Sequence, residues 1–347
     1  MSSSLDKTCL KGMGWDELEE WCIKSGESRH TGQQLFEWMY RHGISSFENM
    51  SNVKKTFRDY LMENCMLQTI EVEKLFPSQM DNSTKILFRT QDGHFIETVS
   101  MVHDDRHTVC ISSQVGCALD CGFCETGRMG LKRNLTTGEI VDQLIYVRTH
   151  EKHPIKNVVF MGMGEPFHNY DNVINAADIF HAHRGFNLAS TRITISTVGI
   201  LPKIQQFIKE KHKYKLAISL NAAEDSLRSK LMPVNEKWSI SDLISSGKDY
   251  SNLKKRQVMF EYVLLKDLND SEEDARQLAH LLKGIPCKLN IIPYNETDGN
   301  YQRPSNQTIS QFSEILHDLR DQYRVLVRWS KGQDINAGCG QLAGQQI

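Results

Sequence analysis

Three cysteines lie close together in the chain, Cys117, Cys121 and Cys124, with the spacing C-x3-C-x2-C. Thiolates are ligands for soft metals, including zinc and the iron of iron–sulfur clusters, and a four-iron cluster usually takes four cysteines. A set of three leaves one iron without a protein ligand, and an open coordination position is typical of a reacting metal site. The alternative is a structural zinc site completed by a distant histidine, although the chain has no second C-x-x-C pair.

Apolar, β-branched runs alternate with amphipathic patterns from about residue 107 onward, and this alternation predicts the elements that position the cysteines. The expected strands are His107–Ser112, Asn157–Met161, Arg192–Ser196, Lys215–Leu220, Val258–Leu265, Lys288–Ile292 and Arg324–Trp329. The expected helices are Thr137–His150, Asp171–Ala182, Pro202–Lys211, Ser239–Lys248, Ser271–Lys283 and Thr308–Tyr323, with Thr137 and Ser271 as caps. Such a succession predicts an α/β fold with a parallel sheet and right-handed crossovers. About six units fit a partial (β/α)6 barrel of the TIM type, and a doubly wound sheet is the alternative.

Polar or glycine-rich segments follow several of the expected strands. Reacting groups of a (β/α) barrel lie after the carboxyl ends of its strands, so these segments are expected to converge on one mouth. They are Gly162–Pro166, Ser196, Ser219–Asn221 and Pro293–Asn295, together with the cysteine loop. We expect a cofactor across this mouth, with Gly162 and Gly164 admitting backbone carbonyls to a ligand ammonium and Glu165 as its charge partner.

The chain before the barrel divides into two parts. Residues 1–70 have helical periodicity, and their basic residues interleave with aromatic ones, which predicts a helical RNA-binding accessory domain. Solvated faces of small amphipathic helices are the alternative. Residues 71–106 are expected to form a β-hairpin linker, with strands at Thr84–Phe88 and Phe95–Val102. Residues 107–347 then form the barrel and a C-terminal loop that carries Cys339.

Composition narrows the class of protein. The chain has 347 residues, of which 39% are hydrophobic, and a formal net charge of −2. This charge excludes a globally basic nucleic-acid binder, so any RNA contact has to come from local basic patches. Neither a signal-like N-terminus nor an apolar run of about 18 residues is present in the sequence, and we therefore expect a cytoplasmic location without membrane contact. Nine irregularly spaced cysteines favour a reducing compartment, where thiols remain available for metal binding or catalysis.

Several longer motifs, in order along the chain, resemble the RlmN/Cfr family of radical S-adenosylmethionine (SAM) RNA adenosine methyltransferases. The resemblance runs from about Arg29 to Gly344 and favours the RlmN-like branch. The motifs are Cys110–Cys117, Gly130–Leu135, Met161–Pro166, Leu231–Asn235 and Cys339–Leu342.

The resemblance implies a fold, cofactors and a division of roles among residues. Cys117, Cys121 and Cys124 would hold a [4Fe-4S] cluster whose open iron binds SAM and yields a 5′-deoxyadenosyl radical. Cys339 resembles the cysteine that is methylated first, and the resulting methylene radical would add to the base. Cys110 resembles the cysteine that resolves the adduct, and Glu97 the proposed proton acceptor. The positions that match cofactor contacts are Gly164, Glu165, Ser196, Ser219, Leu220, Asn221 and Asn295.

The implied substrate is an unstacked adenosine, because a cysteine-borne carbon cannot reach the ring atoms of a stacked, paired base. The family implies 23S ribosomal RNA and, in some members, transfer RNA, with methylation of carbon 2 favoured over the carbon 8 chemistry of the antibiotic-resistance branch. A reducing protein of the flavodoxin or ferredoxin type would donate electrons, and we expect a monomer. A radical SAM enzyme acting on a peptide and a zinc-bearing RNA-binding module are the competing hypotheses. The resemblance also carries the expectation of a disulfide bond, without a pairing.

The sequence departs from the family pattern at several positions. Glu125 follows the last cluster cysteine where Ser or Ala is expected, and Asn221 stands in place of the usual His. In the terminal loop, Asn336 and Gly338 replace the usual Asp and Ala. None of these changes removes a chemical group that the implied mechanism needs.

Overall fold

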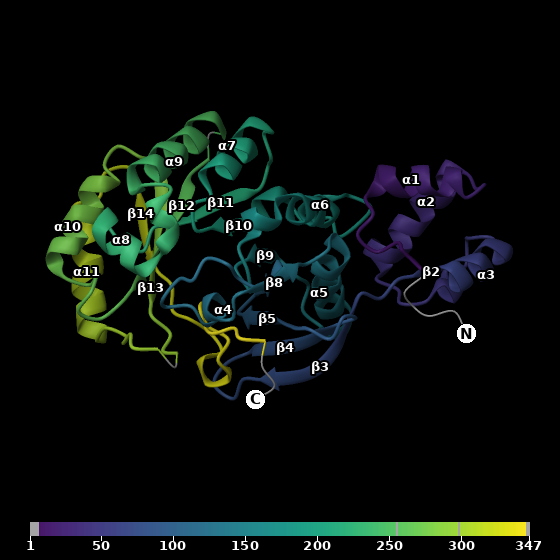
Figure 1. Cartoon of the computed structure of the whole chain (residues 1–347), viewed down its shortest axis with the longest axis horizontal. Coiled ribbons are helices and arrows are strands. Elements are labelled where there is room, and N and C mark those ends of the chain that lie inside the picture. Colours follow the sequence, from purple (N-terminus) through teal and green to yellow (C-terminus); the bar gives the residue numbers. More distant parts are fainter. Residues whose placement is uncertain (1–6, 255, 298, 345–347) are drawn as a thin grey trace.

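The computed structural model describes residues 7–254, 256–297 and 299–344. Expectations that fall on residues 1–6 and 345–347, including the N-terminal segment and the outer domain ends, lie outside this part. Figure 1 shows a helical N-terminal region at one end of an elongated molecule and a fan of strands covered by helices at the other, with the C-terminal segment passing beside β4 and β3. In this described part, no helix is long and apolar enough to cross a membrane.

The N-terminal region is helical, as the periodicity predicts. Its elements are β1 (Thr8–Cys9), α1 (Trp15–Lys24), α2 (Arg29–Phe36), the π-helix η2 (Glu37–His42), the short η3 (Phe47–Asn49), α3 (Lys55–Asn64) and β2 (Cys65–Met66). Strands β1 and β2 pair in parallel and join the two ends of the region. The apolar side chains Leu35, Met39 and Leu61 are fully buried between the helices, so this region has a core of its own.

One buried carboxylate attaches this region to the rest of the molecule. Asp142 lies on α5 (Thr137–His150) and pairs with Lys11 at 3.3 Å. Its other oxygen accepts hydrogen bonds from the backbone nitrogen (2.9 Å) and the hydroxyl (2.7 Å) of Thr69. Gly12 and Gly138 bring the two backbones together, because a Cβ on Gly12 would lie 2.6 Å from the Gly138 nitrogen. The contact therefore depends on glycine at both positions.

A ten-stranded sheet forms the centre of the molecule, in the order β14-β13-β12-β11-β10-β9-β6-β5-β4-β3. The parallel strands begin at β6, and every predicted strand of the barrel is found. These strands are β6 (Arg106–Ile111), β9 (Asn157–Phe160), β10 (Ile193–Thr197), β11 (Lys215–Ser219), β12 (Val258–Leu264), β13 (Cys287–Pro293) and β14 (Arg324–Val327). From β6 to β14 each strand lies beside the next one in the chain, whereas a doubly wound sheet reverses direction at a switch point. This order supports the partial barrel and excludes the doubly wound alternative.

The hairpin expected as a linker is instead part of the main sheet. Strands β4 (Ser83–Thr90) and β5 (Phe95–His103) form at the predicted positions, but a third strand, β3 (Ile70–Pro77), pairs with β4. Strand β5 pairs antiparallel with β6, so all three strands extend the edge of the barrel. An unpaired edge of β6 would leave backbone groups without partners, and β5 supplies them.

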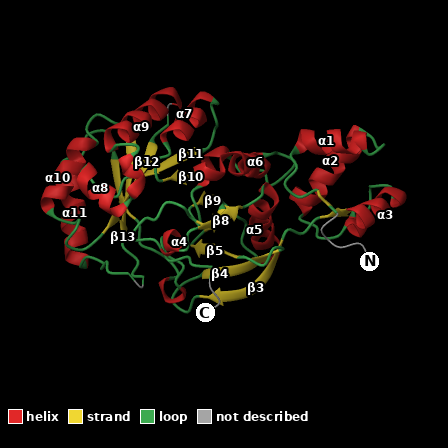
Figure 2. Ribbon diagram, in the orientation of Figure 1, coloured by secondary structure: helices red, strands yellow, loops and turns green. Residues whose placement is uncertain are grey.

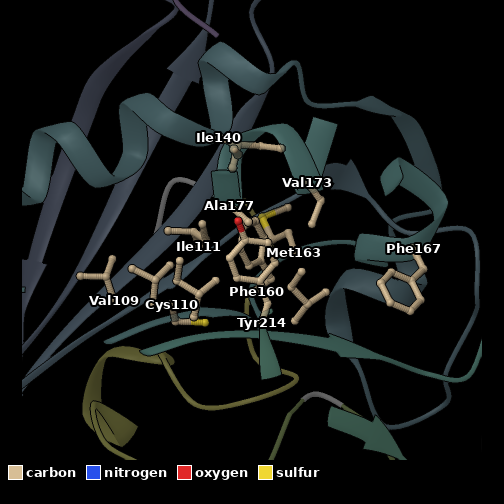
Figure 3. Packing of buried hydrophobic residues seen from close by; sticks show 14 of the residues in the cluster. Val109, Cys110, Ile111, Ile140, Phe160, Met163, Phe167, Val173, Ala177 and Tyr214 are labelled. Atoms are coloured by element: carbon tan, nitrogen blue, oxygen red, sulfur yellow. The ribbon is translucent and has the colours of Figure 1, made fainter. Parts of the chain in front are cut away.

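Helices cover the outer face of the curved sheet (Figure 2). They are α5, α6 (Tyr170–His181), α7 (Leu201–Lys209), α9 (Ile240–Lys254), α10 (Glu272–Leu281) and α11 (Asn306–Asp318), as predicted. Figure 3 shows Ile140 of α5 and Val173 and Ala177 of α6 packed over Ile111 and Phe160 of the sheet. Burial of each larger aliphatic side chain of this kind contributes about 1.5–3 kcal/mol.

The cap of α5 differs by one residue from the prediction. Thr136, not Thr137, accepts a hydrogen bond from the Glu139 nitrogen through its hydroxyl (3.2 Å). The Glu139 carboxylate in turn accepts the Thr136 N–H (2.8 Å), which completes a capping box. A capping box needs its acid three residues after the cap, and this spacing selects Thr136. Ser271 caps α10 as predicted, with Asp274 as the third residue.

Small elements that the periodicity does not predict lie around the mouth of the barrel. They are too short for a repeating apolar pattern to reveal them. These are β7 (Gln114–Gly116), α4 (Glu125–Arg128), β8 (Leu131–Asn134), η4 (Pro166–Asn169), η5 (Ser190–Arg192), α8 (Asp225–Leu231), η6 (Pro233–Glu236) and η7 (Gln333–Ile335).

Candidate active site

The carboxyl ends of the parallel strands surround an open cavity of about 750 Å³, including its mouth. Glycine, serine and carboxylate residues from successive strand ends line it, as the sequence predicts. Among the lining residues are Cys121, Cys124, Gly162, Gly164, Glu165, Ser196, Ser219, Asn221, Glu261 and Cys339.

The cysteine loop lies between β7 and α4 on one wall of this cavity. Gly116 begins the loop with φ +76, and a side chain there would meet the Gly130 carbonyl. The Cys124 nitrogen donates to the Cys121 carbonyl (3.0 Å), which turns the chain so that both residues line the cavity. Cys117 is buried beside them and does not line the cavity itself.

The three thiols of this loop are buried, and burial makes them harder to deprotonate. Burial raises the pKa of Cys117 to about 12 and raises the pKa values of Cys121 and Cys124 as well. Cysteines bind metals as thiolates, so iron binding must release these protons. Among the described residues, no group of three or more His, Cys, Asp or Glu side chains surrounds a single-ion site.

Glu165 is the buried carboxylate expected after the second parallel strand. Its oxygens accept hydrogen bonds from the backbone nitrogens of Phe167 (2.8 Å) and Val198 (2.9 Å). Burial raises the pKa of Glu165 to about 7, because these two hydrogen bonds only partly replace water. Gly164 adopts φ +95, and a Cβ there would lie 2.5 Å from the Gln114 side chain. Gly164 therefore allows the close packing that brings Glu165 to the cavity.

Gly162 packs against a neighbouring strand, and the approach of a ligand expected there stays a prediction. A Cβ at this position would lie 2.7 Å from the carbonyl oxygen of Ile111 on β6. Packing against the neighbouring strand therefore requires glycine at this position whether or not a ligand also approaches it.

The remaining residues expected to contact the cofactor divide into two groups. Ser196, Ser219 and Asn221 line the cavity, whereas Leu220 is buried behind it and Asn295 is not among the lining residues. Asn221 has φ +59, a conformation that asparagine tolerates better than most residues. Its side-chain oxygen accepts the Val263 nitrogen (2.9 Å), so the amide that replaces the usual histidine ties β11 to β12.

A second cavity adjoins the first and contains Cys110. Cys339 and Met161 line both cavities, so Cys339 lies on the shared wall. Figure 3 shows the sulfur of Cys110 on the side that faces the C-terminal segment. The amide of Asn295 donates to the carbonyl oxygen of Cys339 (3.1 Å) and holds the loop at this position. The structure thus brings together the two cysteines that the sequence singles out far apart in the chain.

Burial disfavours the ionised form of both of these thiols. Burial raises the pKa of Cys110 to about 12, and the neighbouring Cys339 adds to this shift. Burial also raises the pKa of Cys339, while the nearby Arg328 guanidinium opposes the shift. All nine cysteines of the chain are free, so no disulfide is formed in this state.

Glu97 lies outside the lining of both cavities. Its carboxylate pairs with Lys85 on β4 at 3.2 Å and accepts the backbone nitrogen of Ala343 at 2.9 Å. The residue thus contacts the C-terminal loop from behind. Its expected role as a proton acceptor stays a prediction.

Two residues of the site carry no clear signal in the sequence. Glu261 on β12 lines the first cavity and accepts the Ser196 hydroxyl at 2.9 Å. Arg228 on α8 is fully buried and donates to the carbonyl oxygens of Val198, Ser219 and Leu220. Arg228 lies shortly before the Leu231–Asn235 motif, which was the one available pointer to it.

The departures from the family pattern have local structural reasons. The Glu125 carboxylate pairs with Arg128 at 3.0 Å, so its charge beside the cluster loop is balanced. Asn336 adopts φ +50, in the left-handed region. A Cβ on Gly338 would lie 2.6 Å from the Asn295 amide, so glycine here leaves Asn295 room to bind the Cys339 carbonyl.

Unpartnered polar atoms test whether the cavity fits the implied cofactors. Glu261 Oε1 and Asn295 Oδ1 are both buried and accept no hydrogen bond. Unsatisfied buried acceptors are costly unless a ligand supplies donors, and SAM carries an ammonium group and ribose hydroxyls. Glu261 lines the first cavity, so its free acceptor and the adjoining cysteine loop fit SAM bound next to a cluster, whereas Asn295 lies outside the lining.

Comparisons with known proteins agree with this geometry. The radical SAM superfamily profile matches residues 111–279, and the profile of the ribosomal RNA large subunit methyltransferase N-terminal domain matches residues 8–67. The dual-specificity RNA methyltransferase RlmN of Desulfotalea psychrophila is 41% identical over 99% of this chain and 97% of its own length. The RlmN of Geobacter sulfurreducens is 42% identical over 97% of this chain and 92% of its own. A crystal structure of a radical SAM methyltransferase from Sphaerobacter thermophilus has a TM-score of 0.92 and 40% identity, covering 97% of this chain and 100% of that one.

Proposed function

The chain belongs to the RlmN family of radical SAM RNA methyltransferases, and on this premise we propose that it methylates carbon 2 of an adenosine in RNA. The family and the radical SAM barrel predicted from the motifs are thereby confirmed. Members of the family use a [4Fe-4S] cluster and SAM. The observation that carries the proposal is the place of Cys339, on the wall between the cavity of the cluster loop and the cavity that contains Cys110.

We assign the cluster to Cys117, Cys121 and Cys124, and SAM to the first cavity. When bound, the two groups supply a methyl donor and one-electron chemistry at the open iron. Glu165 and Glu261 line this cavity and offer carboxylate oxygens to the ammonium and hydroxyl groups of SAM. Asn295 lies outside the lining, and its free Oδ1 is the atom through which we expect it to contact the cofactor. Ser196, Ser219, Asn221 and Gly164 complete the walls, whereas Leu220 is buried outside the lining.

Cys339 carries the carbon that becomes the methyl group. Its sulfur lies within reach of a cofactor in the first cavity and of a base in the second. Addition of that carbon to the base leaves an adduct with one unpaired electron, which must pass to an oxidant such as the oxidised cluster while the proton on carbon 2 leaves. The Cys110 thiolate can then attack the Cys339 sulfur. The sulfur–sulfur bond forms, the sulfur–carbon bond breaks, and its electron pair moves toward the base, where a proton completes the methyl group. The expected disulfide would therefore be a product of turnover, and it must be reduced before the next cycle.

Two protons must be removed for release of the adduct, one from the Cys110 thiol and one from the base. Burial raises the pKa of the Cys110 thiol, and the nearby guanidinium of Arg328 favours its ionised form. Glu97 is the proton acceptor that the family resemblance implies. Its ion pair with Lys85 supports in addition a part in holding the Cys339 loop.

The names of the relatives support two RNA substrates, because they include dual specificity. The N-terminal match to a ribosomal RNA methyltransferase domain supports ribosomal RNA as one of them, and we propose transfer RNA as the other. Carbon 8 methylation and modification of a peptide are not favoured by these full-length matches. The RNA-binding role of the N-terminal domain rests on its match to an RNA methyltransferase domain. We further propose that the enzyme acts as a monomer in the cytoplasm and receives electrons from a flavodoxin- or ferredoxin-type protein.

Anaerobic purification tests the cofactor assignment. We expect a brown protein with iron and sulfide in equal amounts, and loss of both when Cys117, Cys121 and Cys124 are each replaced by alanine. A colourless protein with one zinc ion would contradict the assignment and favour the RNA-binding module.

Cys110→Ala tests the roles of the two cysteines. Expressed in cells that contain the RNA, this variant should carry RNA covalently bound through Cys339, because the resolving thiol is missing. Cys287→Ala is the matched control, since Cys287 is also a buried cysteine on a parallel strand but lines neither cavity. If Cys110→Ala purifies without RNA and still methylates adenosine, the assignment is wrong.

A further inference from the structure

The second cavity has an exposed aromatic wall that the proposed mechanism does not use. Trp329 follows strand β14 and lines this cavity together with Cys110 and Cys339. Its side chain is 49% exposed, although tryptophan is usually well buried in a folded protein. An indole ring kept in solvent beside two reactive thiols calls for a ligand that covers it.

The ring is already held in place on one side. The guanidinium carbon of Arg303 lies 5.2 Å from the centroid of the Trp329 ring. Such a cation–π contact restrains the indole without occupying its opposite face. Arg303 therefore restrains the orientation of the Trp329 ring.

The charge of the cavity suits a nucleotide. Arg328 and Lys331 line it on either side of Trp329 and Ser330. Glu261 is the acid facing Arg328, and its Oε1 lies 3.8 Å from the guanidinium. Lys331 is then available to contact a phosphate at the mouth of the cavity. Contacts of basic residues with phosphates position nucleic acids without reading their sequence.

The lining of the cavity suits one base. Besides Trp329 and the basic residues it includes Met101 and Met161, which add apolar surface. Proteins that bind unpaired RNA stack extruded bases on aromatic and arginine side chains. An adenine stacked on Trp329 would lie in the same cavity as the sulfur that delivers the carbon.

We propose that Trp329, held by Arg303, stacks on the adenine that is presented to Cys339 and so positions it for the reaction. This inference rests on the proposed function and names the residue that holds its substrate. Trp329 is a positioning residue here, because it acts on the base by stacking and takes no part in bond changes.

The test first identifies the adenosine that the wild-type holoenzyme methylates, by mass spectrometry of digested RNA. A stem–loop RNA with 2-aminopurine at that position then reports stacking by fluorescence, in anaerobic holoenzyme without SAM. We expect strong quenching with the wild type and with Trp329→Phe, and a bright complex with Trp329→Leu. On unmodified RNA, Trp329→Leu should raise KM roughly 5- to 150-fold, with a smaller change in kcat.

Leu319→Ala is the matched control, because Leu319 is similarly exposed (46%) and lines neither cavity. Trp329→Leu fills the same place with an apolar side chain, and thermal unfolding of the RNA-free protein checks that it folds. If Trp329→Leu leaves quenching and KM unchanged, or only a neighbouring nucleotide is quenched, the inference is wrong while the function stands. If the wild type methylates no adenosine, the proposed function fails instead.

Discussion

The ammonium of Lys85 lies 3.2 Å from Oε1 of Glu97, and both side chains are at most 2% exposed. The pair joins β4 to β5 directly behind the loop that carries Cys339. The same ammonium reaches the Asn336 carbonyl oxygen (3.5 Å), and the other oxygen of Glu97 accepts the Ala343 nitrogen (2.9 Å). One buried ion pair therefore holds the loop on both sides of the reactive cysteine.

Replacing Lys85 with methionine should loosen this loop. The change leaves the Glu97 charge buried without a partner, which costs about 3–5 kcal/mol. Urea unfolding measures the loss, and tryptic cleavage after Lys331 should become faster. Lys85→Met combined with Glu97→Gln should regain part of the stability.

The control for this prediction is Lys54→Met. Lys54 pairs with Glu27 at a similar distance (3.0 Å), but its side chain is largely exposed, so the change should cost less than about 1 kcal/mol. Equal losses in the two variants would show that the Lys85–Glu97 pair does not hold the loop.

Binding of SAM should depend on pH through Glu165. Burial raises the pKa of this carboxyl to about 7, so it is largely neutral at pH 6 and largely ionised at pH 8. The ammonium of SAM favours the ionised form, and affinity should therefore fall as the pH is lowered below 7, by up to roughly tenfold per pH unit. Calorimetric titration of the anaerobic, cluster-loaded protein measures this.

Glu165→Gln should bind SAM more weakly at pH 8 and should lack the fall below pH 7. Any titration of SAM itself remains in this variant and can be subtracted. Identical pH profiles in the two proteins would show that Glu165 does not contact the ammonium group.

Replacing Arg228 with lysine should damage the site without removing a positive charge. The guanidinium donates to the carbonyls of Leu220 (2.9 Å), Ser219 (3.0 Å) and Val198 (2.6 Å), which follow or end two adjacent strands. Lysine cannot reach all of these acceptors, and each buried group left unsatisfied costs about 1–3 kcal/mol. We expect a loss of about 3 kcal/mol or more in urea unfolding, together with weaker SAM binding.

An exposed arginine provides the comparison for Arg228→Lys. Arg276 pairs with Glu272 one turn away on α10, and both side chains are more than half exposed. Arg276→Lys should change stability by no more than about 0.5 kcal/mol. A similarly small effect at Arg228 would contradict its role in joining the strand ends.

Asp142→Asn should release the N-terminal region from the barrel. The amide keeps the shape of the side chain but leaves the buried ammonium of Lys11 without its counter-charge. Hydrogen exchange in residues 8–67 should accelerate while the barrel strands stay protected. Asp171→Asn, at an exposed position in the first turn of α6, should leave both unchanged. Uniform acceleration in both regions would instead indicate global destabilisation.

Much of the fold is predictable from local pattern. The parallel strands and the helices between them appear within a few residues of their expected positions, because apolar periodicity over a whole element is a strong signal. Most side chains of strand β3 are exposed, so apolar periodicity does not reveal this strand. Its pairing with β4 makes it the edge strand of the sheet. The short elements α4 and α8 are missed for a related reason, since each spans only one or two turns.

Site residues are predictable from the sequence where their type and spacing indicate a function. They are less predictable where their role depends on contacts with residues far away in the chain. Gly164, Glu165, Ser196 and Ser219 line one cavity because parallel strands end at the same edge of the sheet. The sequence gives no comparable signal for Arg228 and Glu261. A buried charged residue is identified by the groups that it contacts, and these are known only from the structure.

By itself, the sequence determined the cysteine spacing, the order of strands and helices, and the motifs that identify the family. These are properties of neighbouring residues or of repeating pattern, which a linear chain displays. Only the tertiary structure decided that Cys339 lies on the wall between two cavities, that Glu97 faces Lys85, and that Trp329 forms part of the cavity of Cys110. These relations join segments far apart in the chain, and they arise only when long-range strand pairing closes the barrel.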